Sequence, residues 1–204
     1  MNKQVSMEHY DFKKYCYPDR WNSYYYQIQE ILHTNPESVL EVGAGDETVK
    51  NYVVRAIGSD YKTLDIADDL KPDIKGSILA IPLDDKSFDT ACAFEVLEHI
   101  PWDDVPKALS ELARIAKGRV LISVPHFGPP IRFSLKLPFL PDIFFLWKIP
   151  FPKKHVWNSQ HYWELGKRNY RVEAFRRLLR VHFKIDKEFI PWNNTYHHFF
   201  VLSK

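Results

Sequence analysis

The chain has 204 residues, of which 45% are apolar, a length that favours one domain with a sizeable core over two independent domains. Its two cysteines, Cys16 and Cys92, form no CxxC pair, so a disulfide framework and a cysteine metal site are both disfavoured. The N-terminus is polar and no run of about 18 apolar residues is available to span a bilayer, so we expect a soluble, cytoplasmic protein.

The net charge of +2 is unevenly distributed along the chain. Residues 131–181 hold eleven Lys and Arg against three Asp and Glu, a local charge of +8, whereas the remainder carries −6. This basic segment is either a solvated face or a surface for an anionic partner.

Apolar patterns predict alternating helices and strands. A helix is expected over 18–33, where it packs on a sheet or covers its cleft. Further helices are expected over 47–56 and around 105–115, the latter ended by Gly118. Strands are expected at 38–43, 61–65, 87–95 and 119–125, with a weaker one at 73–78. This alternation predicts an α/β fold whose parallel strands have their carboxyl ends at one edge.

The pattern breaks over 126–169, where six prolines interrupt an aromatic, basic stretch too apolar to remain solvated. We expect a lid that excludes water and attracts an anionic acceptor, or else an insertion with a small core of its own. A helix at 172–181 and strands at 183–190 and 197–203 then complete one domain over 1–204, with 1–35 as its N-terminal helical segment. The lid residues would be Phe133, Phe139, Phe144, Phe145, Trp147, Arg132, Lys136, Lys148, Lys153 and Lys154.

A glycine-rich turn, Gly43-Ala44-Gly45, follows the first strand in VLEVGAGDE. It lets a ligand approach the backbone, and the next helix offers free amide donors at its N-terminus. Such a turn also suits a nucleotide dehydrogenase or a plain tight turn. Asp65 ends the second strand 20 residues after Gly45, where its carboxylate can accept hydrogen bonds from two ribose hydroxyls, unless it is a loop or helix-capping aspartate. The pair favours an adenosine-containing ligand.

The ordered motifs VLEVGAG, TLDI, GSILAIPLDDKSFD and AFEVLEHI resemble those of class I S-adenosylmethionine-dependent methyltransferases of the type 11 group. The resemblance covers about 38–125, under half of the chain. It implies a Rossmann-like, doubly wound, mostly parallel seven-stranded sheet with an antiparallel last strand, and S-adenosylmethionine as cofactor. By this resemblance, Glu41, Gly43 and Gly45 face the methionine portion of the cofactor, and Asp65 faces its ribose. Ile78 packs on the adenine, and Glu95 lies beside the sulfonium. Further cofactor contacts are Ala44, Ser77 and Val96, and the LEH-like stretch is Leu97, Glu98 and His99.

Two positions depart from the family pattern. Glu47 stands where a third glycine is common, at a helix N-terminus where its charge is favourable to the helix dipole. Ser77 stands where an aspartate often binds the adenine amine, so we expect weaker adenine recognition.

Methyl transfer from a sulfonium requires the protein chiefly to align the acceptor and exclude water. An oxygen acceptor also needs a base, and histidine has a suitable pKa. The candidate bases are His126, directly after the fifth strand, and His155 and His161 in the insertion; the alternative for His126 is a loop histidine that satisfies backbone groups. His197 and His198 point to opposite faces of the last strand and are interpreted as structural. The histidines show no recognisable ligand spacing, so no metal is expected.

AFEVLEH stands where methyltransferases of planar amides and nucleobase amines commonly have an NPPY-like element, and EVLEHI resembles ubiquinone-type O-methyltransferases. We therefore expect methyl transfer to oxygen of a small-molecule, glycan-like or lipid-linked acceptor, with an anionic acceptor suited to the basic segment. Nucleic acid is not expected as a partner, whereas peripheral contact with an anionic membrane is compatible with that segment. The alternatives are a non-catalytic RNA- or membrane-binding module on the same fold, and a nucleotide-dependent oxidoreductase.

Overall fold

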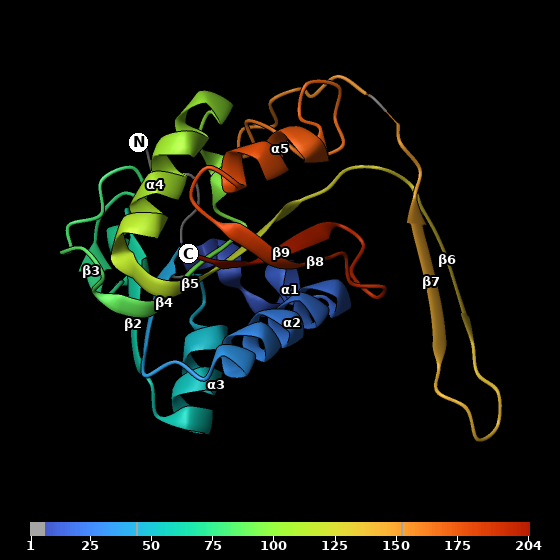
Figure 1. Ribbon diagram of the computed structural model, residues 1–204, viewed down its shortest axis with the longest axis horizontal. Helices are drawn as coiled ribbons and strands as arrows, with labels where there is room; N and C mark the ends of the chain where they lie inside the picture. Colours follow the sequence, from blue (N-terminus) through green and yellow to red (C-terminus); the bar gives the residue numbers. More distant parts are fainter. Residues whose placement is uncertain (1–6, 44, 152) are drawn as a thin grey trace.

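The computed structural model describes residues 7–43, 45–151 and 153–204. Its centre is a seven-stranded sheet with the strand order β3-β2-β1-β4-β5-β9-β8 (Figure 1). The strands are β1 (Ser38–Val42), β2 (Asp60–Asp65), β3 (Ile74–Lys75), β4 (Phe88–Phe94), β5 (Ala116–Pro125), β8 (Lys184–Phe189) and β9 (His197–Ser203). Strands β1 to β5 pair in parallel, and β9 runs antiparallel to both β5 and β8. The mostly parallel, Rossmann-like sheet with an antiparallel last strand is therefore confirmed.

Helices cover both faces of the sheet, as Figure 1 shows. The longer ones are α2 (Pro18–Thr34) and α3 (Thr48–Ile57) on one face, and α4 (Val105–Ile115) and α5 (Val172–Leu179) on the other. Strands β1, β4 and β5 are buried between these layers, which is why their sequences are nearly continuous apolar runs. The short helices are η1 (Met7–Tyr10), α1 (Phe12–Tyr15), η2 (Asp68–Leu70), η3 (Leu97–His99) and η4 (Trp102–Asp104).

Two expected boundaries are wrong. Strand β3 covers only two residues of the expected 73–78, because the chain turns after Gly76 and Ser77 pairs with Ala80 in an isolated bridge. A side chain on Gly76 would lie 2.8 Å from Pro82 Cδ, so this turn requires glycine. Gly118 does not end α4: the helix passes directly into the extended β5 at Ala116, and Gly118 lies within that strand.

The insertion after β5 contains a hairpin of β6 (Pro130–Leu135) and β7 (Ile143–Lys148) that extends away from the sheet (Figure 1). Its base is attached to the loop between β8 and β9. Arg132 donates to the backbone oxygen of Trp192 at 3.0 Å, and the Trp192 indole donates to the backbone oxygen of Phe145 at 3.1 Å. Lys148 donates to the backbone oxygen of Thr195 at 2.8 Å. The arm is thus anchored at one end and exposed along its length.

Within the described ranges, no helix has both the length and the apolar character needed to cross a membrane.

Candidate functional site

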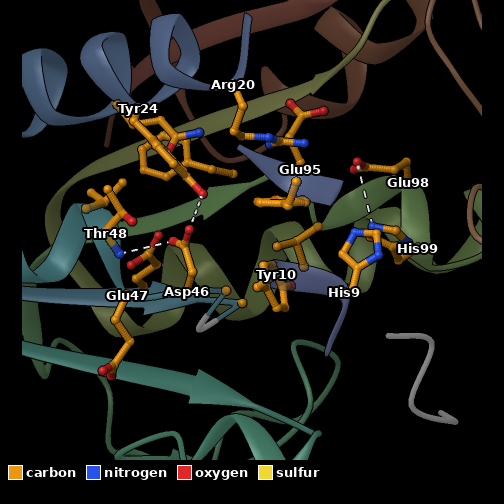
Figure 2. A pocket seen from close by; sticks show the side chains of 18 of the residues that line it. His9, Tyr10, Arg20, Tyr24, Asp46, Glu47, Thr48, Glu95, Glu98 and His99 are labelled. Carbon is orange, nitrogen blue, oxygen red and sulfur yellow. Dashed lines mark hydrogen bonds and ion pairs between the residues drawn. The ribbon is translucent and has the colours of Figure 1, made fainter. Parts of the chain in front are cut away.

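A pocket opens at the carboxyl edge of the sheet, where β1 and β4 lie side by side (Figure 2). Its walls come from the ends of these strands, the start of α3, the segment η1–α1–α2, the helix η3 and residues 160–161. In parallel α/β sheets this edge is where ligands bind, because the strand ends and helix N-termini converge there.

The turn after β1 is built for close backbone approach. Gly43 and Gly45 have φ of +92° and +53°, the left-handed region that glycine adopts without strain. A side chain on Gly43 would lie 2.6 Å from Val96 Cγ2, so that position cannot accept one without a shift of its neighbour. Glu47 also has a positive φ of 57°, at the position where the family commonly has a third glycine. Ala44 lies outside the described residues.

Asp46 joins this turn to two helices. Its Oδ1 accepts from the backbone N–H of Thr48 at 3.1 Å, at the start of α3. Its Oδ2 accepts from the hydroxyl of Tyr24 in α2 at 2.8 Å, and Figure 2 shows both bonds. The aspartate therefore fixes the turn against α2.

Glu41 is a buried carboxyl group at the end of β1. The Tyr61 hydroxyl donates to its Oε2 at 3.0 Å. Burial nevertheless raises the pKa of Glu41 to about 8. A cation bound beside it would favour the ionised form.

Glu95 immediately follows β4 and takes a φ of 55°, which is unfavourable for a residue with a side chain. Burial raises its pKa to about 7, against the opposing effect of Arg20. Its Oε2 lies 3.3 Å from His197 Nε2, and its Oε1 is buried with no hydrogen-bond partner among the described residues. Unsatisfied buried oxygens of this kind are rare and suit a ligand contact.

A buried chain of hydrogen bonds holds His197 against Glu95. Gln27 donates to Ser23 Oγ at 3.0 Å, and Ser23 Oγ is hydrogen-bonded to His197 Nδ1, 2.7 Å away. Burial lowers the pKa of His197 well below its usual value, so the ring is neutral, and its Nε2 faces Glu95. His197, interpreted from sequence as structural, is thus a direct neighbour of a site carboxylate.

Arg20 of α2 brings a positive charge into this acidic pocket, and its guanidinium carbon lies 4.3 Å from the centroid of the Tyr15 ring. The view in Figure 2 shows the guanidinium next to Glu95. Its buried Nε has no hydrogen-bond partner among the described residues. The group is therefore able to bind an anionic part of a ligand.

Glu98, His99 and His161 form the other end of the pocket. Glu98 is fully buried, and burial together with the neighbouring Glu95 charge raises its pKa well above its usual value. His99 Nε2 lies 3.9 Å from Glu98 Oε1, and its Nδ1 lies 3.0 Å from the backbone oxygen of Gln160. The rings of His99 and His161 meet edge to face, with their centroids 5.1 Å apart.

The N-terminal segment covers the remaining side. Tyr10 packs against Ala67 and Leu70 and lies 3.9 Å from where a side chain on Gly45 would begin. Burial raises the pKa of Tyr10 to about 12, so the phenol stays protonated. Residues of α2 pack on the sheet and also line the pocket, so the helix combines the two placements that the sequence left open.

The structure brings together only some of the expected cofactor contacts. Five line the pocket: Glu41, Gly43, Gly45, Glu95 and Val96. The other described ones do not line it and make local contacts. The Asp65 carboxylate accepts from the Ala67 N–H at 2.8 Å, Ser77 Oγ accepts from the Leu79 N–H at 3.2 Å, and Ile78 is buried in the core. Their roles toward the cofactor stay predictions.

Of the three candidate bases, only His161 lines this pocket. His126 lies at the base of the hairpin, where its ring stacks on His198 and its N–H donates to the backbone oxygen of Tyr196 at 2.7 Å. Burial lowers the pKa of His126 to about 3, below the range of a useful base at neutral pH. His155 Nε2 lies 3.0 Å from the backbone oxygen of His161, so it supports the loop that carries His161.

Sequence reasoning missed the N-terminal contribution to the site, because Tyr10, Arg20 and Tyr24 belong to no recognisable motif and reach the pocket only through folding. Glu98 and His99 were visible as part of the LEH-like stretch, but their partner His161 comes from the insertion. None of the lid residues expected in 126–169 lines the pocket; Gln160 and His161 are the only described residues of that insertion that do.

The residues present fit S-adenosylmethionine. Its sulfonium and ammonium groups are cationic, and the pocket offers the carboxylates of Glu41, Asp46 and Glu95. The carboxylate of the cofactor is anionic, and Arg20 offers it a positive charge. The two glycines of the turn leave the backbone accessible, as a nucleoside ligand at this edge requires.

Comparisons with known proteins also support S-adenosylmethionine as the cofactor. A family model described as a methyltransferase domain matches residues 8–180. No curated protein sequence matches the chain. Among solved structures, magnesium protoporphyrin IX methyltransferase from Synechocystis PCC 6803 with bound S-adenosylhomocysteine has a TM-score of 0.63 at 14% identity, covering 100% of this chain and 90% of that one.

Two further structures share the fold across nearly the whole chain. A protein from Pyrococcus horikoshii OT3 has a TM-score of 0.61 at 12% identity, covering 98% of this chain and 99% of its own. The N-methyltransferase NodS from Bradyrhizobium japonicum WM9, in complex with S-adenosylhomocysteine, has a TM-score of 0.59 at 10% identity, covering 92% and 88%. With the family match over most of its length, the chain belongs to the methyltransferase domain family and is an S-adenosylmethionine-dependent methyltransferase of the class I fold.

Proposed function

We propose that the protein, acting as one domain over 1–204, transfers the methyl group to an oxygen atom of a small-molecule, glycan-like or lipid-linked acceptor. One observation carries this proposal: the buried Glu95 carboxylate faces the pocket with an oxygen that has no hydrogen-bond partner among the described residues. A carboxylate whose pKa burial raises to about 7 is suited to remove a hydroxyl proton near neutral pH.

The cofactor would lie across the ends of β1, β2 and β4. Glu41, Gly43 and Arg20 would hold its methionine portion, with the guanidinium on the carboxylate. Asp65, at the end of β2, would accept hydrogen bonds from the ribose once the covering Tyr10 yields to the ligand. Ser77, Ile78 and Val96 would line the adenine and sulfonium regions, and Ala44 the turn.

When bound, S-adenosylmethionine supplies an electrophilic methyl group on a positively charged sulfur. The acceptor oxygen would form a bond to that carbon, the carbon–sulfur bond would break with its electron pair left on sulfur, and the hydroxyl proton would pass to Glu95. His197 would keep the Glu95 carboxylate oriented toward the acceptor through its Nε2. His161 lies at the same end of the pocket, in reach of the acceptor, whereas His126 lies outside it.

The test is to incubate the enzyme with S-adenosylmethionine and a panel of hydroxyl, carboxylate and amine acceptors. Release of S-adenosylhomocysteine and the mass of the product are measured together. O-methyl products that disappear in Glu95→Gln, with cofactor affinity retained, support the proposal. Products methylated only at nitrogen would overturn the assignment of oxygen as the acceptor atom.

The hairpin suggests how a lipid-linked or anionic acceptor would reach the enzyme. In the β6–β7 register, paired residues share one face of the ribbon, and that face is entirely apolar and exposed. Its residues are Ile131, Phe133, Leu135, Ile143, Phe145 and Trp147. Phe139 at the tip is fully exposed, and segment 130–148 carries three basic side chains, Arg132, Lys136 and Lys148, against the single acidic Asp142, which pairs with Lys136 at 2.8 Å. We propose peripheral contact with an anionic membrane through this arm.

Membership of the methyltransferase domain family excludes the alternative of a nucleotide-dependent oxidoreductase.

A further inference from the structure

Three potential metal ligands from two separate segments converge beside Glu95. One donor atom from each of Glu98, His99 and His161 lies within 4.8 Å of the other two. Donors bound to one ion at about 2.0–2.2 Å are roughly 3–3.5 Å apart, so the three need to close by about an ångström. Figure 2 shows Glu98 and His99 side by side at this end of the pocket.

Glu98 is the group that most requires a cation. Its side chain is 1% exposed, and neither carboxylate oxygen has a hydrogen-bond partner among the described residues. A buried carboxylate without a partner is strongly unfavourable, and such groups are usually paired or bound to metal. The oxygen nearest His99 is still 3.9 Å from the ring nitrogen, too far for a hydrogen bond.

His99 has the supporting hydrogen bond that metal-binding imidazoles commonly have, and His161 has the Glu164 carboxylate nearby. His99 Nδ1 lies 3.0 Å from the backbone oxygen of Gln160, a contact that orients the ring with Nε2 on the Glu98 side. His161 Nδ1 lies 3.6 Å from Glu164 Oε1, an ion-pair distance that is too long for a hydrogen bond. A carbonyl or carboxylate behind the ring orients and strengthens a metal-binding histidine.

We propose that Glu98, His99 and His161 bind a divalent transition-metal ion, of the class of Zn²⁺ or Mn²⁺, at the end of the pocket next to Glu95. Two imidazoles and one carboxylate suit such ions and leave open coordination positions. The inference rests on the proposed function, because an open position would receive the acceptor oxygen and favour its deprotonated form. The proposal departs from the expectation of no metal. Its third ligand, His161, comes from the insertion, and its spacing from Glu98 and His99 in the sequence matches no known ligand pattern.

The experiment titrates metal-free protein with Zn²⁺ and, separately, with Mn²⁺ by calorimetry, and records the visible spectrum of bound Co²⁺. We expect one ion per chain for the unmodified protein. Glu98→Gln and His161→Gln should each weaken binding by more than about 100-fold. His182→Gln, which removes an imidazole beyond α5, is the matched control and should leave the affinity unchanged.

Absence of stoichiometric binding, or equal affinity in His161→Gln and His182→Gln, would overturn the inference. His161→Gln is the decisive variant if Glu98→Gln fails to fold, and circular dichroism verifies the fold of each. S-adenosylhomocysteine binding to the metal-free protein is measured in parallel. Cofactor binding without metal binding overturns only the metal site, whereas metal binding without cofactor binding overturns the cofactor site and leaves the metal site standing.

Discussion

The pocket and the hairpin differ in charge and in packing. The pocket is lined by buried carboxyl groups, among them Glu41, Glu95 and Glu98. The hairpin carries basic and large apolar side chains, and its tip residue Phe139 is fully exposed. The difference separates an acid-rich site, which suits a cationic cofactor, from an exposed arm, for which we propose contact with an anionic membrane.

The largest expected effect tests the pocket. Asp65→Ala should reduce the affinity for S-adenosylmethionine by more than about 100-fold, because two charge-assisted hydrogen bonds to the ribose are worth roughly 3 kcal/mol or more. Isothermal titration calorimetry measures the loss. Asp60→Ala, an exposed aspartate of the same strand, is the control and should bind normally. An unchanged affinity in Asp65→Ala would remove Asp65 from the cofactor site.

The second effect tests the hairpin. Phe139→Ser combined with Leu140→Ser should weaken binding to vesicles rich in anionic lipid by about 100-fold, because each exposed apolar side chain gains roughly 1.5–3 kcal/mol on burial. Vesicle co-sedimentation measures the change, and Val181→Ser, an exposed apolar residue beyond α5, serves as control. Thermal stability should be retained. If the arm binds RNA or a second copy of the chain in preference to vesicles, the membrane proposal is wrong.

The pH dependence of cofactor affinity gives a second test of the pocket. Burial raises the pKa of Glu41 to about 8, so this carboxyl group is largely protonated at pH 6 and ionised above pH 8. A cationic cofactor favours the ionised form, so its affinity should rise with pH over this range, by up to about tenfold per unit below the pKa, and binding should release protons. Calorimetry in two buffers of different ionisation enthalpy measures the protons released. Glu41→Gln should abolish this dependence, and a flat profile in the unmodified protein would contradict the role of Glu41.

The smallest expected effect concerns the turn of the pocket. Glu47 holds a φ of 57°, a conformation that costs a residue with a side chain about 1–2 kcal/mol. Glu47→Gly removes that strain and loses a half-buried ion pair to Lys50, so we expect a net gain of about 0.5–1 kcal/mol in the free energy of unfolding. Denaturant titration measures it. Glu37→Gly, at a position with negative φ, should give no gain.

Most of the fold followed from local patterns. The strands β1, β4 and β5 are runs of apolar residues because helices bury both faces, and the register of β9 sends His197 and His198 to opposite sides, as alternation requires. The wrong expectations concern segments whose hydrophobic pattern is weak. The aromatic insertion was expected to form either a lid or a small core of its own, yet its hairpin extends away from the sheet, because composition does not encode the direction of a segment.

By itself, the sequence determined the α/β fold, the glycine turn and the acidic residues at the strand ends, because these depend on periodicity and on spacing within a few residues of a strand. Only the tertiary structure decided which side chains complete the site. Arg20, His197 and His161 reach Glu95 and Glu98 from three distant segments, and such long-range contacts depend on how the elements pack. The same packing buries Glu95 and Glu98, and burial, which no sequence pattern reports, gives these carboxyl groups their altered pKa values.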